Sequence, residues 1–102
     1  MIGYRFLSVA LEESGLAAHY YENQEQGLGK AFLDELGAKI EMLRKFPNSG
    51  TPSKHRVRTV ILRRFPFSIV YYVTDNELTI VSVAHQSRQP EFWIDRLHDR
   101  TN

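Results

Sequence analysis

Cysteine is absent from the 102-residue sequence, which excludes disulfide bonds, zinc sites built on thiolates and cysteine nucleophiles. Long apolar runs are also absent, and no stretch approaches the length of about 18 residues that crosses a bilayer. Residues 1–10 contain one arginine and no extended apolar segment, unlike a secretory signal peptide. These absences predict a cytoplasmic protein with no membrane partner.

The familiar catalytic motifs are missing as well. No HExxH, P-loop or GxSxG pattern occurs. His19, His55, His85 and His98 are scattered, without acidic residues beside them at metal-ligand spacing, so we expect no metal and no cofactor. The arginines, histidine and tyrosines that remain suit metal-free chemistry on an RNA phosphate, because arginine stabilises developing charge while His or Tyr moves protons. They suit binding of a phosphate or a protein surface without catalysis equally well.

Charge is balanced overall at +1 but unevenly distributed. Residues 1–50 carry five Lys or Arg and seven Asp or Glu, whereas residues 51–102 carry eight and five. The segment 54–64 contains no acidic residue, and its cations are Lys54, Arg56, Arg58, Arg63 and Arg64. Such a basic block predicts an anionic partner, either nucleic acid or an acidic peptide. The alternative is a solvated strand edge whose charge prevents aggregation.

The first half of the chain predicts two amphipathic helices in an antiparallel hairpin. The first begins near Ala10 and is broken at Gly27, and its apolar face consists of Leu11, Ser14, Ala18 and Tyr21. The second ends before Pro47, where a turn-forming segment follows. Its stripe is the clearest in the sequence and consists of Leu28, Phe32, Leu36, Ile40 and Leu43. We expect this stripe to form the core.

Strands are predicted on either side of this hairpin. Aromatic and β-branched residues indicate strands at residues 4–9, 57–62, 67–73 and 78–83. Short links make the last three an antiparallel meander, and Pro90 is expected in the first turn of a short C-terminal helix. Strict alternation in the last strand would place on one face Leu78, Ile80, Ser82 and Ala84. The length and element order predict one α+β domain, residues 1–102: an N-terminal strand, a helical hairpin, a three-stranded antiparallel meander and a short C-terminal helix.

Polar side chains that could act on a ligand follow the ends of the predicted strands. His85 ends the last strand, Arg88 lies in the next loop, and Arg64 follows the basic strand. Antiparallel pairing would bring the three ends within reach of one phosphate. The alternative is that His85 and Arg88 are structural residues that bond nearby backbone groups. Trp93 is expected to anchor the core or a lid rather than to stack on a ligand.

Several short motifs, in the same order along the chain, resemble the RelE/ParE superfamily of toxins, and the resemblance covers about residues 4–97. The motifs are ALEE at 10–13, YYE at 20–22, GLG at 27–29, FLDEL at 32–36, RFPF at 64–67 followed by IVY at 69–71, and VAH at 83–85 continuing through Arg88, Pro90 and Trp93 to Arg96. The resemblance implies a fold with one strand, two helices and an antiparallel sheet. It also implies the toxin of a type II toxin–antitoxin, or plasmid stabilisation, system, whose partner is a small cognate antitoxin.

The resemblance leaves two activities open. ParE-like toxins inhibit growth by binding DNA gyrase, and the YYE helix and the His-x-x-Arg-x-Pro ending are closer to that group. RelE-like toxins are metal-free endoribonucleases that cut mRNA in the ribosome, and this activity implies catalytic roles for Arg64, His85 and Arg88. A full RelE-like set of catalytic residues would also include a Tyr or His in the C-terminal tail. His98 is the candidate for that role here, and Phe92 lacks a hydroxyl. A non-toxic interaction domain is the further alternative.

Whether or not there is a catalytic set, six basic residues are expected to bind the partner or nucleic acid. These are Lys54, Arg56, Arg58, Arg63, Arg64 and Arg96.

Overall fold

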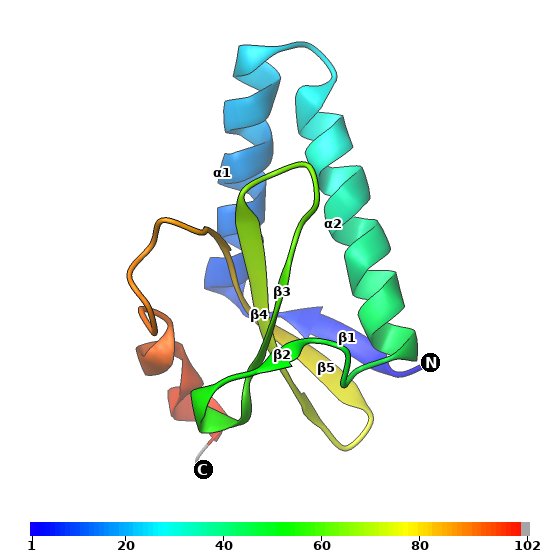
Figure 1. Cartoon of the computed structure of the whole chain (residues 1–102), viewed down its shortest axis with the longest axis vertical. Helices are drawn as coiled ribbons and strands as arrows, with labels where there is room; N and C mark the ends of the chain where they lie inside the picture. The colour runs from blue at the N-terminus through cyan, green and yellow to red at the C-terminus, as the bar shows by residue number, and fades with distance from the viewer. Residues whose placement is uncertain (101–102) are drawn as a thin grey trace.

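The computed structural model describes residues 1–100, with side chains through residue 97. A helical hairpin lies against a mixed sheet, and the C-terminal segment returns to the side of the sheet away from the helices (Figure 1). In chain order the elements are β1 (Gly3–Phe6), α1 (Ser8–Gln24), α2 (Leu28–Lys45), β2 (Thr51–Pro52), the 3-10 helix η1 (Lys54–Arg56), β3 (Arg58–Ile61), β4 (Phe67–Thr74), β5 (Glu77–His85) and the 3-10 helix η2 (Ile94–Arg100). The predicted α+β fold is confirmed.

The sheet has five strands in the order β1-β5-β4-β3-β2. The three strands β3, β4 and β5 form the predicted antiparallel meander. The N-terminal strand β1 joins the meander beside β5 and runs parallel to it. At the other edge β2 adds a short pairing with β3 that the sequence did not predict. Two residues that include Pro52 carry no alternating pattern from which a strand could be predicted.

Small side chains let α1 approach the rest of the protein closely. The buried residues of α1 are Ala10, Ser14, Ala17 and Ala18. Leu11, which we expected on the buried face, is exposed. Val9 belongs to α1 and not to the first strand, because β1 already ends at Phe6.

The core between the hairpin and the sheet is built around the stripe of α2. Phe32, Leu36, Ile40 and Leu43 are buried as expected, and Leu28 is half-buried. Phe32 lies at the centre of an aromatic cluster whose other members are Tyr21, Phe65 and Phe67. The β3–β4 turn therefore docks on the hairpin through Phe65, which anchors the residues on either side of it.

A β-bulge changes which residues of β5 share a face. The register shifts between Val70 and Tyr71, so that Val70 pairs with Ser82 while Tyr71 pairs with Ile80. Ile80 and Val83 belong to the core beneath the helices, whereas Val81 packs into a second cluster on the opposite face. The predicted alternation from Leu78 through Ala84 is therefore wrong from Ser82 onward, because the bulge inserts one extra residue.

The second cluster lies between the sheet and the C-terminal segment. Its buried members are Val57, Val70, Tyr72, Val81, Trp93 and Leu97. The final helix begins at Ile94 as a 3-10 helix, so Pro90 does not start it. The backbone of Glu91, at φ 64°, is left-handed and separates Pro90 from the helix. Trp93 is a core anchor, as expected.

The loop before β3 is held by Tyr71. Its hydroxyl donates to the carbonyl of Pro47 at 2.7 Å and accepts from the amide of Gly50 at 3.0 Å. Arg58 donates to the carbonyls of Asn48 and Gly50. Burial raises the pKa of Tyr71, so the neutral phenol is the form that the folded protein favours. These bonds hold the segment that leads to the basic residues of η1.

Gly29→Ala should destabilise the protein by about 1–3 kcal/mol, because a Cβ there must displace packed atoms. That carbon would lie 2.5 Å from the backbone oxygen of Ala18 and 3.0 Å from Cβ of Glu22. Gly37→Ala is the matched control on the same helix, with nothing within 4 Å of its Cβ. It should stabilise the protein by about 0.5–1 kcal/mol through helix propensity. Urea unfolding measures both changes, and equal effects would contradict the close packing of α1 and α2.

Candidate functional site

A hollow of about 320 Å³ lies where the C-terminal segment covers the sheet face away from the helices. Its floor is formed by residues of the three meander strands, and its walls by η1 and the segment after β5. The residues that line it are Ser53, Lys54, Thr59, Ser68, Val70, Ser82, Ala84, His85, Gln86, Arg88, Gln89, Pro90, Glu91, Phe92 and Trp93. This hollow brings together two of the three candidate catalytic residues, His85 and Arg88.

His85 is the last residue of β5 and is exposed. It pairs with Phe67 across the sheet, and the two ring centroids lie 5.5 Å apart. The Nδ1 atom of His85 accepts a hydrogen bond of 3.0 Å from the amide of Ser87. Because Nδ1 is occupied as an acceptor, Nε2 is the position through which this ring can exchange a proton with a ligand.

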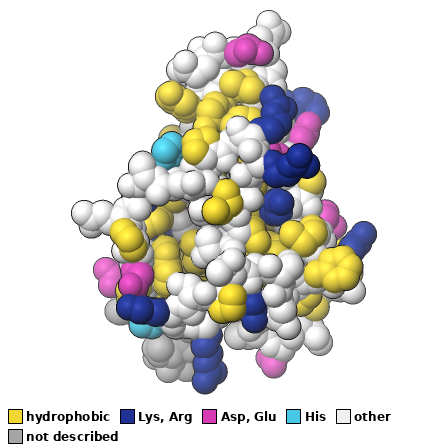
Figure 2. Space-filling model, viewed as in Figure 1, with side chains coloured by type: hydrophobic (Ala, Val, Ile, Leu, Met, Phe, Trp, Pro, Cys, Tyr) yellow, Lys and Arg dark blue, Asp and Glu magenta, His cyan; other side chains and the backbone are white. Residues whose placement is uncertain are grey.

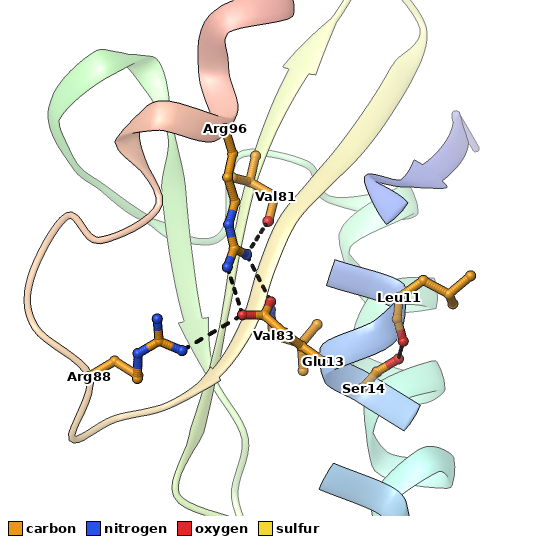
Figure 3. Close-up of polar contacts among 7 residues, drawn as sticks. All are labelled: Leu11, Glu13, Ser14, Val81, Val83, Arg88 and Arg96. Carbon is orange, nitrogen blue, oxygen red and sulfur yellow. Dashed lines mark hydrogen bonds and ion pairs between the residues drawn. The ribbon is translucent and has the colours of Figure 1, made fainter. Parts of the chain in front are cut away.

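Arg96 and Arg88 converge on Glu13 from two sides (Figure 3). Glu13 reaches from α1 and takes two bonds of 2.9 Å from Arg96. These two side chains are only 15% and 17% exposed. Arg88 approaches from the loop after β5, with its Nη1 3.9 Å from the same carboxylate. Arg96 is therefore engaged in a mostly buried bidentate ion pair, whereas the ion pair of Arg88 with the same carboxylate is longer and more exposed.

Backbone bonds extend this network to β5. The amide of Val83 donates to Glu13 at 3.1 Å, and Arg96 also donates to the carbonyl of Val81 at 3.0 Å. One carboxylate thus joins α1, β5 and the C-terminal helix. Glu13 was not among the expected site residues, because it lies 83 positions from Arg96 and nothing in the local sequence connects them. Its place within the ALEE motif was the one signal that could have drawn attention to it.

Arg88 is positioned by an aromatic ring as well as by charge. Its guanidinium carbon lies 3.9 Å from the centroid of Phe92, and that of Arg96 lies 5.2 Å from the same centroid. Stacking on an aromatic face orders a guanidinium while leaving its N–H groups able to bind an anion. The side chain of Arg88 remains 50% exposed. It is thus ordered and accessible to solvent at the same time.

Arg64 lies in a different hollow. A space of about 740 Å³ between α2 and the β3–β4 turn is lined by Arg63 and Arg64 together with residues of α2. The backbone amides of Arg63 and Arg64 both donate to the carboxylate of Glu35. The residues lining this space differ from those around His85 and Arg88.

The other expected binding residues divide into two groups. Arg58 and Arg96 bond protein groups, as described above. Lys54, Arg56, Arg63 and Arg64 are exposed, and Lys54 lies 3.5 Å from the carboxylate of Glu91. In the face drawn in Figure 2, Lys and Arg side chains gather beside the helical hairpin, next to exposed apolar side chains. The tail candidate His98 lies outside the residues whose side chains the structure describes.

No helix within the described part of the chain has both the length and the apolar character needed to cross a membrane.

Comparison with known proteins agrees with the resemblance read from the motifs. The sequence model described as "ParE toxin of type II toxin-antitoxin system, parDE" matches residues 4–90. A solved structure titled "Chromosomal ParDE TA system from P. aeruginosa" has a chain of similar fold, with a TM-score of 0.63 and 21% sequence identity. The match covers 83% of this chain and 96% of that one. No curated protein sequence matches. On the strength of the match over residues 4–90, this chain belongs to the family of ParE toxins of type II toxin–antitoxin systems.

Proposed function

We propose that the protein inhibits bacterial growth by binding DNA gyrase, and that a cognate antitoxin neutralises it. The family match over residues 4–90 carries this proposal, because ParE-like toxins act on gyrase rather than on mRNA. Growth inhibition by a binding protein requires an accessible surface and no catalytic group. The exposed cations of the basic block are suited to an acidic patch on such a target.

The arrangement of the arginines favours binding over cleavage. A metal-free nuclease needs cations and a proton carrier around one phosphate. Arg96 is neutralised by Glu13, and Arg64 lines a separate hollow from His85. Phe92 has no hydroxyl with which to move a proton. The RelE-like alternative therefore depends on His85 and Arg88, which do line one hollow.

The antitoxin is expected to wrap the toxin with a helix and an added strand. The outer edge of β3 offers a place for the strand, because β2 pairs with Arg58 and Thr59 and not with Ile61. Ile61 is among the exposed large apolar residues. On α1, apolar side chains at helical spacing are exposed at Val9, Leu16 and Tyr20. An amphipathic antitoxin helix would cover these side chains.

The purified toxin should inhibit DNA supercoiling by gyrase and leave cell-free translation unaffected. In cells, His85→Ala should retain growth inhibition, because a gyrase-binding toxin makes no use of a proton carrier. His19→Ala, which removes an exposed histidine of α1, is the matched control. Co-expression of the neighbouring small open reading frame should restore growth. Translation arrest with mRNA cleavage that His85→Ala abolishes would instead establish the RelE-like activity.

A further inference from the structure

A buried hydroxyl without a hydrogen-bond partner lies in the hollow beneath the C-terminal segment. Ser82 is fully buried, and its Oγ bonds no other group among the described residues. Buried polar atoms are almost always satisfied, so an unsatisfied one requires an explanation. Ser82 lies at the β-bulge and lines the hollow that also contains His85 and Arg88. Because Ser82 is 0% exposed, a ligand in the hollow can supply the missing partner only where the side chains that cover this hydroxyl move aside.

Two more hydroxyls accompany it on the same floor. Thr59 and Ser82 both pair with Val70 in the sheet, one from each neighbouring strand. Ser68 precedes Val70 by two positions and so shares its face. All three residues line the hollow. Three adjacent strands thus each contribute a hydroxyl-bearing residue to the lining of one small volume, which forms a polar floor beside an otherwise apolar cluster.

Two cationic side chains line the hollow together with these hydroxyl-bearing residues. Lys54 and Arg88 line the hollow with His85, and Glu91 is the one carboxylate among the lining residues. The ion pairs of Lys54 and Arg88 have N–O distances of 3.5 and 3.9 Å, and both cations are at least half exposed. Such long, solvent-exposed ion pairs contribute little to stability, so either cation can leave its carboxylate for another anion. A phosphate, which accepts several charge-assisted hydrogen bonds, would compete well for both cations.

We propose that this hollow binds the phosphate of a 5′-nucleotide, with Arg88 and Lys54 at the phosphate and the Ser82 hydroxyl at its inner end. The volume of about 320 Å³ lies in the range of small-molecule sites. The side-chain amides of Gln86 and Gln89 line the same space and can donate to and accept from sugar or base. Nothing in this binding requires that the nucleotide be cut, and it is independent of gyrase inhibition.

Titration of the ¹⁵N-labelled protein with 5′-AMP at constant ionic strength tests this site. The amide signals of Ser82, Ala84 and His85 should shift with 5′-AMP, shift less with inorganic phosphate and remain unmoved with adenosine. A short single-stranded RNA with a 5′-phosphate distinguishes the source of the nucleotide. If the RNA shifts the same amide signals and binds more tightly than 5′-AMP, the ligand is the 5′ end of an RNA strand. If the RNA binds more weakly than 5′-AMP, the ligand is a free nucleotide. Shifts scattered over the surface, or none, would overturn the proposal.

Arg88→Gln should weaken 5′-AMP binding about tenfold, the equivalent of one charge-assisted hydrogen bond. Arg5→Gln is the matched control, because Arg5 is also paired with one glutamate and is 48% exposed against 50% for Arg88. Arg5 lies on β1 and lines neither hollow. Ser82→Ala should weaken binding without lowering the melting temperature. Equal affinities for the Arg5 and Arg88 variants, or an unchanged affinity for Ser82→Ala, would contradict the site.

Discussion

Phe32→Ala should lower the free energy of unfolding by about 3–5 kcal/mol, because it removes a fully buried aromatic side chain and leaves a cavity. Phe32 is 0% exposed. Its ring centroid lies 5.6, 5.2 and 5.1 Å from those of Tyr21, Phe65 and Phe67. These neighbours come from α1, the β3–β4 turn and β4. Removal of the Phe32 ring therefore weakens the packing between the helical hairpin and the sheet.

Leu33→Ala is the control for this substitution, since Leu33 is the next residue of α2 and is 45% exposed. Its effect should stay within about 0.5 kcal/mol, as for most surface changes. Urea unfolding followed by circular dichroism gives both values, provided that the dependence on denaturant is unchanged. A loss for Phe32→Ala no larger than that for Leu33→Ala would show that the α2 stripe does not form the core.

Local periodicity was sufficient to predict the helices and the meander. The stripe from Phe32 to Leu43 repeats over several turns, so one face is specified without knowledge of the partner. The strands of the meander are joined by short links, which makes antiparallel pairing the expected result. In contrast, β1 pairs with β5 across more than 70 residues. No local sequence pattern reveals such a distant partner, so the parallel pairing of β1 with β5 could not be predicted from the sequence.

The β-bulge in β5 shows a different limit of prediction from the sequence. Alternation along β5 predicts two faces, and a single extra residue reverses the assignment from Ser82 onward. Val83 then belongs to the core beneath the helices, and Ser82 faces the C-terminal segment with the second cluster. The residues around the bulge are ordinary β-branched and small side chains, so no Gly or Pro marks the position. One of the most informative residues of the hollow, Ser82, was therefore assigned to the wrong face.

The candidate site was predicted in part. The end of β5 and the loop after it do contain His85 and Arg88 in one hollow, because strand ends collect polar side chains. The basic block was read as a single surface, yet Arg58 within it bonds loop carbonyls. Arg96, which was also expected to bind a partner, bonds Glu13. A count of charges treats every arginine as equivalent. Whether an arginine faces a partner or a protein carboxylate depends on tertiary contacts between distant residues.

The two faces of the sheet are held in different ways. Large aromatic and aliphatic side chains fill the face beneath the helices, and they form a continuous core. The opposite face has a smaller cluster, closed by Trp93 and Leu97. The C-terminal segment that covers it contains turns and a 3-10 helix instead of a regular α-helix. Such a segment depends on specific side-chain bonds, and the bidentate pair between Arg96 and Glu13 supplies the strongest of them.

Glu13→Ala should therefore destabilise the protein by about 3–5 kcal/mol, since it leaves the Arg96 guanidinium in a mostly buried position without its counter-charge. The same change also removes the acceptor of the Val83 amide. Glu12→Ala, at the neighbouring exposed position of α1, should change stability by less than about 0.5 kcal/mol. The double variant Glu13→Ala with Arg96→Met should recover part of the loss, because it removes both charges together.

Trp93 makes the loss of the C-terminal anchor directly observable. It is the only tryptophan in the sequence, is buried, and lies in the segment that Arg96 anchors. In the wild-type protein, tryptophan fluorescence and circular dichroism should report the same unfolding transition. In Glu13→Ala the fluorescence change should occur at lower urea than the loss of helix, because the segment detaches before the core between helices and sheet unfolds. Coincident transitions in that variant, with stability reduced by less than about 1 kcal/mol, would show that the second cluster holds the segment without the ion pair.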